Sequence, residues 1–150
     1  MAMSEAKFDL HIHDLLREAG INAEYQSTDS IELKEALSTA SKSQTGEPGR
    51  PDYIAVVEGY VIVIEDKKDR DKLLLLGDDG TISLTPQATK DYAVNGAVWY
   101  AKKILQHGTY TKIFALGNAG DKKRYTLKPC FVGSNMVKEL EEIEIGRAHV

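Results

Sequence analysis

Apolar residues near the start of the chain recur at the spacing of one helical face, which predicts an amphipathic helix that ends at Gly20. The residues on this face are Phe8, Ile12, Leu15, Leu16 and Ala19. A second, shorter helix is predicted over residues 31–37, with Ser30 among its candidate N-caps. Residues 41–51 collect Ser, Gly, Pro, Lys and Gln, a composition typical of a loop.

Two β-rich segments, residues 52–57 and 60–64, flank the dipeptide Glu58-Gly59 and predict a tight hairpin. The second segment is apolar at every position after Tyr60, which is typical of a central strand buried on both faces. Residues 73–76 and 82–84 flank a Gly-Asp-Asp-Gly turn and predict a further hairpin. Because residues 60–64 are apolar on both faces, helices are expected to cover both faces of the sheet.

Thr85 as an N-cap and Pro86 at the first helical position predict one long, largely buried helix that ends near Gly108. Two last strands are expected over residues 112–116 and 125–132. The order α-α-β-β-β-α-β-β predicts an α/β (α+β) fold with a mixed central sheet flanked by helices. We expect one domain over residues 1–143. Residues 144–150 resemble a translated sequencing-library adapter, and we expect them to be an artefactual tail on a truncated gene.

Composition excludes several classes of protein. With 42% hydrophobic and 28% charged residues in 150, the chain has the balance of a globular domain. Its longest aliphatic runs are far short of the roughly 20 residues needed for a membrane span. The single cysteine, Cys130, excludes an internal disulfide framework and a multi-thiolate zinc site, and we expect a cytoplasmic protein. The net charge of -4 gives no overall attraction to nucleic acid, so any such binding must be local.

The expected hairpin carries the candidate chemistry. A two-residue turn at Glu58-Gly59 places Asp52 opposite Glu65, with their β-carbons roughly 4.5–5.5 Å apart. Lys67 lies two residues beyond Glu65 and is expected on the same face. Opposed carboxylates at the end of a buried strand are costly unless a cation joins them, and oxygen ligands suit Mg²⁺ or Mn²⁺. A lysine beside them can orient water and offset the negative charge of a phosphodiester transition state.

The pattern Pro51-Asp52, twelve residues, then Glu65-Asp66-Lys67 resembles the signature of the PD-(D/E)xK nuclease superfamily. The resemblance implies a restriction-endonuclease-like core, with Asp52 and Glu65 as metal ligands, an assisting carbonyl of Asp66, and Lys67 as the catalytic lysine. With residues 40–42 and 91–97, the chain is similar, over residues 4–135, to the nuclease-like domain of restriction-modification proteins. That domain precedes an adenine-specific DNA methylase or accompanies type I restriction subunits.

The same resemblance implies supporting residues. Such enzymes often place a Gln and a Tyr on the helix after the active-site strand, and Gln87 and Tyr92 fall there, although they are five residues apart and not four. An acid from the first helix is often added, and Glu5 lies in line with the apolar face; Asp9 is the second choice, and a frayed, non-functional acid is the alternative.

Two groups of cations are candidate contacts for DNA phosphate. One follows the proposed site and includes Lys68 and Lys72; the other is Lys122, Lys123 and Arg124. For both groups the alternative is a solvated loop or turn without a ligand.

The expected function is that of a Mg²⁺-dependent DNA endonuclease domain of a restriction-modification system. Its expected partners are double-stranded DNA, the methylase and specificity domains or subunits, and a second copy of itself for double-strand scission. The alternative is a non-catalytic DNA-docking or subunit-interaction module at the N-terminus of an adenine-specific DNA methyltransferase. A glycine-rich phosphate loop and the methylase motifs are missing, so this segment should neither hydrolyse ATP nor methylate DNA.

Overall fold

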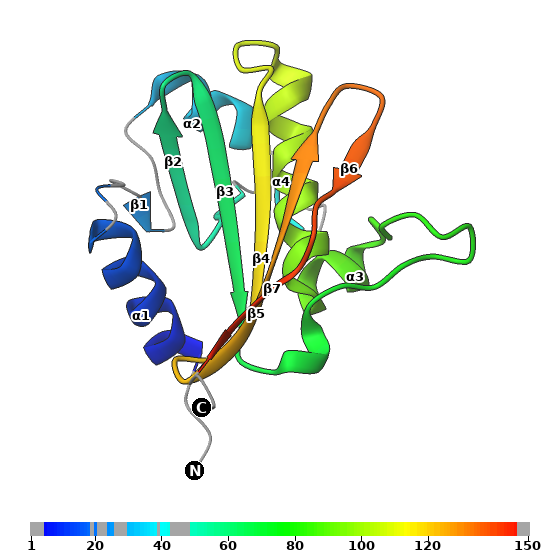
Figure 1. Cartoon of the computed structure of the whole chain (residues 1–150). Helices are drawn as coiled ribbons and strands as arrows, with labels where there is room; N and C mark the ends of the chain where they lie inside the picture. Colours follow the sequence, from blue (N-terminus) through cyan, green and yellow to red (C-terminus); the bar gives the residue numbers. More distant parts are fainter. Residues whose placement is uncertain are drawn as a thin grey trace.

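The computed structural model describes residues 5–18, 20, 24–25, 30–38, 40–42 and 49–146, and it forms a central sheet with helices on both faces (Figure 1). The helices are α1 Glu5–Glu18, α2 Ile31–Leu37, the short 3-10 helix η1 Arg70–Lys72, α3 Pro86–Asp91 and α4 Ala93–His107. The strands are β1 Glu24–Tyr25, β2 Tyr53–Val57, β3 Tyr60–Lys67, β4 Ile113–Asp121, β5 Arg124–Val132, β6 Val137–Glu139 and β7 Ile143–Gly146.

The sheet is mixed. Within the described residues it has seven strands in the order β1-β2-β3-β4-β5-β6, and β7 pairs with β5. The neighbours β3 and β4 are parallel, because α4 carries the chain back across the sheet between them, and the other pairs are antiparallel. The expected mixed α/β architecture is confirmed, and it is compatible with a restriction-endonuclease-like core.

The β2–β3 hairpin has the register that the sequence predicts. Glu58 and Gly59 both adopt positive φ, 51° and 86°, as a two-residue type I′ turn requires. Val57 therefore pairs with Tyr60, and the ladder continues to the pair Tyr53 and Ile64. This turn is the local feature that sets which residues meet at the other end of the hairpin.

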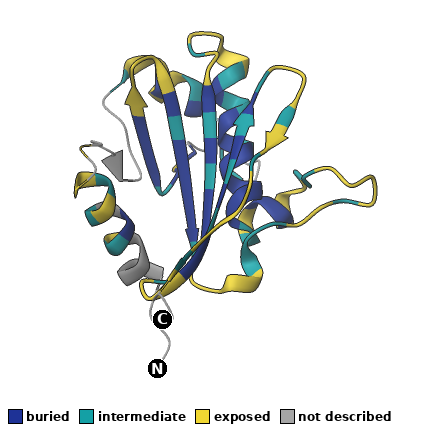
Figure 2. Cartoon of the chain, viewed as in Figure 1, coloured by how far each residue is buried: buried dark blue, intermediate teal, exposed yellow. Residues whose placement is uncertain are grey.

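Apolar side chains cover both faces of β3, which is buried along most of its length (Figure 2). On one face Val61 and Val63 pack with α2 and α4, in a cluster that includes Leu33, Val98 and Ile104. On the other face Ile64 packs with Ile12 of α1. Alternate residues of β3 thus face different helices, and this alternation separates the polar residues at its C-terminal end. None of the helices in the described part of the chain has the length and apolar character needed to cross a bilayer.

The prediction of a single long helix after Thr85 is wrong. Tyr92 is extended, with φ -117° and ψ 137°, and divides it into α3 and α4. The expected Thr85 cap is confirmed, because its hydroxyl accepts a hydrogen bond from the backbone of Ala88 at 3.2 Å. The break at Tyr92 lets α3 lie beside one end of α4, while α4 runs along the face of the sheet (Figure 1).

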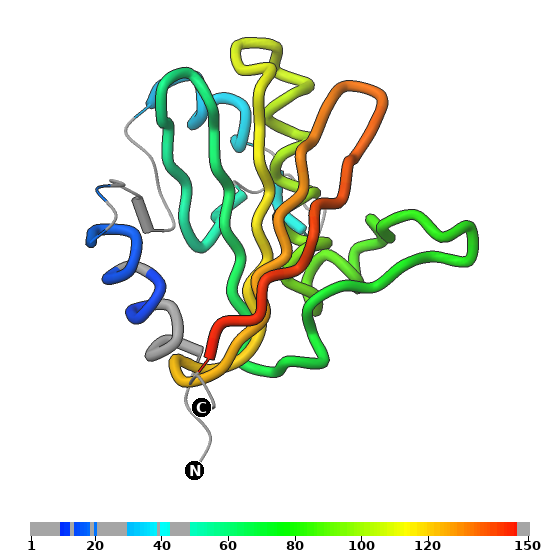
Figure 3. The backbone as a smooth tube through the Cα atoms, viewed as in Figure 1, coloured from blue at the N-terminus to red at the C-terminus, as the bar shows by residue number. Residues whose placement is uncertain are grey.

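The expected hairpin of residues 73–76 and 82–84 is reduced to a single bridge between Leu76 and Ile82. The segment projects beside α4 as a loop (Figure 3), and Asn95 ties it there through Leu75 and Ser83. Polar contacts with a helix thus replace the ladder bonds of a longer hairpin. The strands β1, β6 and β7 are not anticipated by the sequence pattern, and residues 144–146, which we leave out of the expected fold, pair with β5 in β7.

Candidate functional site

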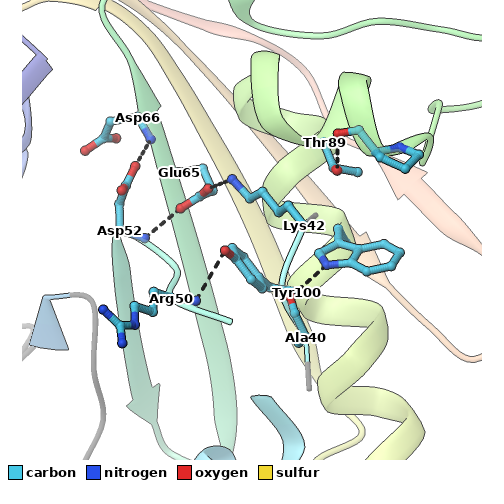
Figure 4. Close-up of polar contacts among 10 residues, drawn as sticks. Ala40, Lys42, Arg50, Asp52, Glu65, Asp66, Thr89 and Tyr100 are labelled. Atoms are coloured by element: carbon cyan, nitrogen blue, oxygen red, sulfur yellow. Dashed lines mark hydrogen bonds and ion pairs between the residues drawn. The ribbon is translucent and has the colours of Figure 1, made fainter. Parts of the chain in front are cut away.

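The candidate site lies where the start of β2 meets the end of β3. Asp52 directly precedes β2, and its backbone N–H donates a hydrogen bond of 2.6 Å to Glu65 Oε2. The carboxylate of Asp52 accepts the backbone N–H of Asp66 at 2.8 Å through Oδ2. These two bonds continue the hairpin beyond its last ladder pair, and they hold Asp52 and Glu65 side by side, as the two-residue turn predicts (Figure 4).

Lys42 pairs with the same carboxylate from the segment that follows α2. Its ammonium contacts Glu65 Oε1, and the two side chains are only 14% and 3% exposed. It also lies over the ring of Tyr100, 5.1 Å from the centroid. Burial, the largest single cause, lowers the pKa of Lys42, but the charge of Glu65, the hydrogen bond to it and the nearby Tyr100 and Asp52 together outweigh burial, so the pKa is raised. Lys42 is therefore a charged lysine held inside the protein.

Tyr100 closes this side of the site from α4. Its hydroxyl accepts a hydrogen bond from the backbone N–H of Arg50 at 3.3 Å, which ties the segment before β2 to the helix. Burial, and then the negative charge of Glu65, raise the pKa of Tyr100 to about 12. The phenol is therefore uncharged at physiological pH and lines one side of the site.

Asp66 points to the opposite face of the sheet from Glu65, as alternation along β3 requires. It is fully buried, and its Oδ1 accepts a hydrogen bond of 3.0 Å from Asn118 Nδ2 of β4. The carboxylate of Asp66 is thus directed away from Asp52 and Glu65, and only its backbone lies at the candidate site. Asn118 Oδ1 is also buried, with no hydrogen-bond partner among the described residues.

Lys67 ends β3, where it pairs with Ala119 of β4. It is half-buried, and alternation along the strand places it on the face of Glu65. The candidate nuclease residues Asp52, Glu65 and Lys67 therefore share one face at one end of the sheet.

The donor set suits a magnesium ion. Mg²⁺ commonly takes one or two carboxylates and keeps several waters, and Asp52 and Glu65 supply two. Among the described residues no group of three or more His, Cys, Asp or Glu is arranged to hold a metal ion. Both carboxylates already accept hydrogen bonds, so a cation here would have to compete with or join these contacts.

The expected supporting residues are dispersed. Gln87 is exposed on α3, where its side chain bonds to Asp91 of the same helix, and Tyr92 forms the break before α4. The prediction that both belong to one helix is therefore wrong. The side chains of Glu5 and Asp9 lie outside the described residues; the helix that carries them packs through Ile12 on the face opposite Glu65.

Most of the candidate DNA-binding cations lie at the same end of the sheet as the site. Because β3 and β4 are parallel, the chain after Lys67 and the turn after β4 emerge at one end (Figure 3). Lys68 is exposed there, and the turn residues Lys122, Lys123 and Arg124 are exposed as well. Lys72 is different: it is half-buried and lies over the ring of Tyr92, 5.1 Å from its centroid.

Sequence reasoning did not assign a role to Lys42, the residue in closest contact with Glu65. Residues 40–42 stand out in the sequence only as part of a family resemblance, and a lysine in a polar segment is ordinarily solvated. Gly96 leaves space beside Lys42, since a Cβ at this position would lie 2.7 Å from the Lys42 ammonium and 2.7 Å from the carbonyl oxygen of Thr89. A glycine in the middle of an apolar helix was the available signal, because it indicates a close approach.

Comparison with known proteins relates the chain to restriction-modification enzymes. It is 34% identical over 146 residues, 96% of its length, to part of the type II restriction enzyme and methyltransferase RM.BcgI of Heyndrickxia coagulans. The chain spans only 23% of the length of that protein. No family model matches the chain, and no solved structure matches it.

Proposed function

We propose that this chain is the DNA-cleaving domain of a restriction-modification enzyme and hydrolyses phosphodiester bonds with Mg²⁺ or Mn²⁺. The observation that carries the proposal is the contact of Asp52 with Glu65 at the end of the hairpin, to which alternation along β3 adds Lys67 on the face of Glu65. The similarity to a restriction enzyme and methyltransferase supports the same class of function. Magnesium-dependent hydrolysis is the chemistry that this set of side chains suits best.

In this proposal Asp52 and Glu65 hold the cation, and the backbone carbonyl of Asp66 assists. The bound cation would supply charge neutralisation at the phosphate and a water with a lowered pKa. Lys67 orients the attacking water and offsets the negative charge that develops on the phosphoryl oxygens. Lys42 pairs with Glu65 from the side of α4, and the ring of Tyr100 lies against Lys42.

Double-stranded DNA is the proposed substrate. The exposed cations Lys68, Lys122, Lys123 and Arg124 lie at the end of the sheet that carries the site, and they would bind the phosphate backbone without reading sequence. Recognition of a sequence, and methylation, would belong to other domains or subunits of the system, because the chain covers about a quarter of its relative. A second copy of the domain would serve the second strand.

The test is cleavage of unmethylated plasmid DNA in Mg²⁺, in this chain and in any longer protein that continues it. Asp52→Asn, Glu65→Gln and Lys67→Met should each lower the rate at least about a hundredfold. The matched controls are Asp71→Asn and Lys34→Met, which remove exposed charges outside the site and should leave the rate unchanged. Unchanged cleavage in all three site variants would refute the proposal.

A non-catalytic module for docking on DNA or on another subunit is the second candidate. It is favoured by one observation: both oxygens of Glu65 are already bound, one by Lys42 and one by the N–H of Asp52. Such a site can be complete without metal. Calorimetric titration with MgCl₂ separates the two functions, since a docking module should show no binding that depends on Asp52 and Glu65.

A further inference from the structure

We propose that Lys42 is an internal counter-ion of Glu65 that competes with the divalent cation for this carboxylate and so weakens the affinity of the site. The inference rests on the proposed function, because it takes Glu65 as a metal ligand. It assigns Lys42 a positioning role that is separate from that of Lys67.

The first support is the contact itself. The Lys42 ammonium pairs with Glu65 Oε1, and both side chains are almost completely buried. Exposed ion pairs contribute little and adopt many geometries, whereas a buried pair has one partner and one geometry. Of the described residues, Lys42 is the one that forms an ion pair with Glu65. The pair is therefore part of the built site.

The second support is the slot that holds the lysine. Gly96 leaves the backbone of α4 bare at this point, and a Cβ there would lie 2.7 Å from the ammonium. The ring of Tyr100 lies on another side of it. Trp99 Nε1 donates to the carbonyl of Ala40 at 3.0 Å, which anchors the chain two residues before Lys42. Three residues of α4 thus enclose the lysine or anchor the chain before it. Figure 4 shows Lys42 between Tyr100 and Glu65.

The third support is electrostatic. A carboxylate that is 3% exposed requires compensation of its charge, and in the absence of metal Lys42 and the N–H of Asp52 supply it. A divalent cation bound by Glu65 would share this carboxylate with the ammonium, and two positive charges so close together repel strongly in a partly buried site. The lysine must either move away or remain at a cost. In both cases its removal should tighten cation binding.

The experiment compares the wild-type chain with Lys42→Met by calorimetric titration with MgCl₂ and with MnCl₂. We expect Lys42→Met to bind the cation at least about tenfold more tightly. Without metal its melting temperature should fall, because Glu65 loses its partner, and added Mg²⁺ should raise it by more than in the wild type. The double variant Lys42→Met with Glu65→Gln should lose this response to Mg²⁺.

Lys103→Met is the matched control, since Lys103 lies over the ring of Trp99 at 4.6 Å much as Lys42 lies over Tyr100. It should leave the cation affinity unchanged. If Lys42→Met does not fold, as judged by circular dichroism, Lys42→Gln removes the charge while keeping a hydrogen-bond donor, and the same tightening is expected.

Equal or weaker cation binding by the folded Lys42 variant overturns the inference. The proposed function then still stands if Glu65→Gln alone weakens cation binding by at least about tenfold relative to the wild type. Absence of cation binding in the wild type and in both Lys42 variants overturns the two proposals together. Tighter binding that persists in the double variant also overturns the inference, because the cation would then not be held by Glu65.

Discussion

Glu65 and Asp66 are consecutive residues of β3, yet their carboxylates lie on opposite faces of the sheet. Glu65 meets Lys42 beside α4, whereas Asp66 accepts a hydrogen bond from Asn118 on the other face. The strand thus divides two buried acids between two environments. Only the backbone of Asp66, whose N–H donates to Asp52, lies on the side of the proposed cation.

Asp66→Asn should therefore preserve cation binding. The substitution keeps the backbone carbonyl and the N–H that bonds to Asp52 at 2.8 Å, so we expect a Kd for Mg²⁺ within about threefold of the wild type. Glu65→Gln, measured in the same titration, should weaken it by at least about tenfold. A loss in Asp66→Asn as large as that in Glu65→Gln would place the Asp66 side chain among the ligands.

Asn95→Ala should destabilise the fold by about 2–4 kcal/mol. Asn95 is fully buried, and its amide makes three hydrogen bonds, two to the backbone of Leu75 and one to the carbonyl of Ser83. Their loss leaves buried backbone groups unsatisfied and releases residues 73–85 from α4. Urea unfolding measures the first effect, and limited proteolysis of this segment measures the second. Asn135→Ala, at an exposed position, is the control.

Gly117→Ala should lower the free energy of unfolding by about 1–3 kcal/mol. Gly117 pairs with Glu65 across β3 and β4, and an added Cβ would come within 2.6 Å of the backbone nitrogen of Val94. Helix α4 would have to move away from the sheet to admit it. Gly77→Ala, where the nearest atom would be 3.4 Å away, should change the stability by less than about 0.5 kcal/mol. Equal effects in the two variants would contradict this account of the helix–sheet contact.

Cys130 should be almost inert to thiol reagents at pH 8. It is fully buried, and burial, followed by the negative charge of Glu139, raises the pKa of its thiol from 9.0 to about 11. It is the one cysteine of the chain, so labelling reports it directly. The rate should rise to that of an exposed thiol only in denaturant, and Cys130→Ala with Ser134→Cys supplies an exposed thiol as the comparison.

The raised pKa of Cys130 also predicts how the free energy of unfolding changes at alkaline pH. The folded state favours the protonated thiol, so its contribution to stability is complete below about pH 9 and is lost as the pH rises through about 11. Plotted against pH, the unfolding free energies of the wild type and Cys130→Ala should have different slopes between about pH 9 and pH 11, and equal slopes below and above this interval. Parallel curves throughout the range would show that the thiol has the same pKa in both states.

Lys122→Ala with Lys123→Ala should weaken DNA binding at low salt. If both side chains contact phosphate, the slope of log K against log salt concentration should fall in magnitude by about 2. Both residues are exposed in the turn after β4, at the end of the sheet that carries the proposed site. The control pair Lys34→Ala with Lys138→Ala removes the same charge from other exposed positions and should leave the slope unchanged. Equal effects of the two pairs would indicate a response to net charge alone.

Local chemistry was sufficient to predict the hairpin that carries the candidate acids. A two-residue turn at Glu58 and Gly59 permits one register, and that register determines which residues meet thirteen positions apart in the chain, at Asp52 and Glu65. The cap at Ser30 is equally local, because its side chain bonds to Leu33 three residues away. The roles of Asp52, Glu65 and Lys67 in catalysis remain predictions.

Features that depend on packing between distant segments could not be predicted in this way. No proline or glycine at position 92 marks the break between α3 and α4. Residues 73–85 form contacts with Asn95 where a longer hairpin was expected. The expected helix and hairpin were reasonable from local patterns. Tertiary contacts of α4 overrode both of them.

The sequence alone therefore determined the order of most elements, the hairpin register and the shared face of Asp52, Glu65 and Lys67, because turns, caps and strand alternation act over a few residues. Only the tertiary structure decided the partners of the acids. Lys42 reaches Glu65 from 23 residues away, and Asn118 reaches Asp66 from 52 residues away, once α4 has crossed the sheet and aligned β4 with β3. Such contacts are set by the packing of whole elements, which no short stretch of sequence encodes.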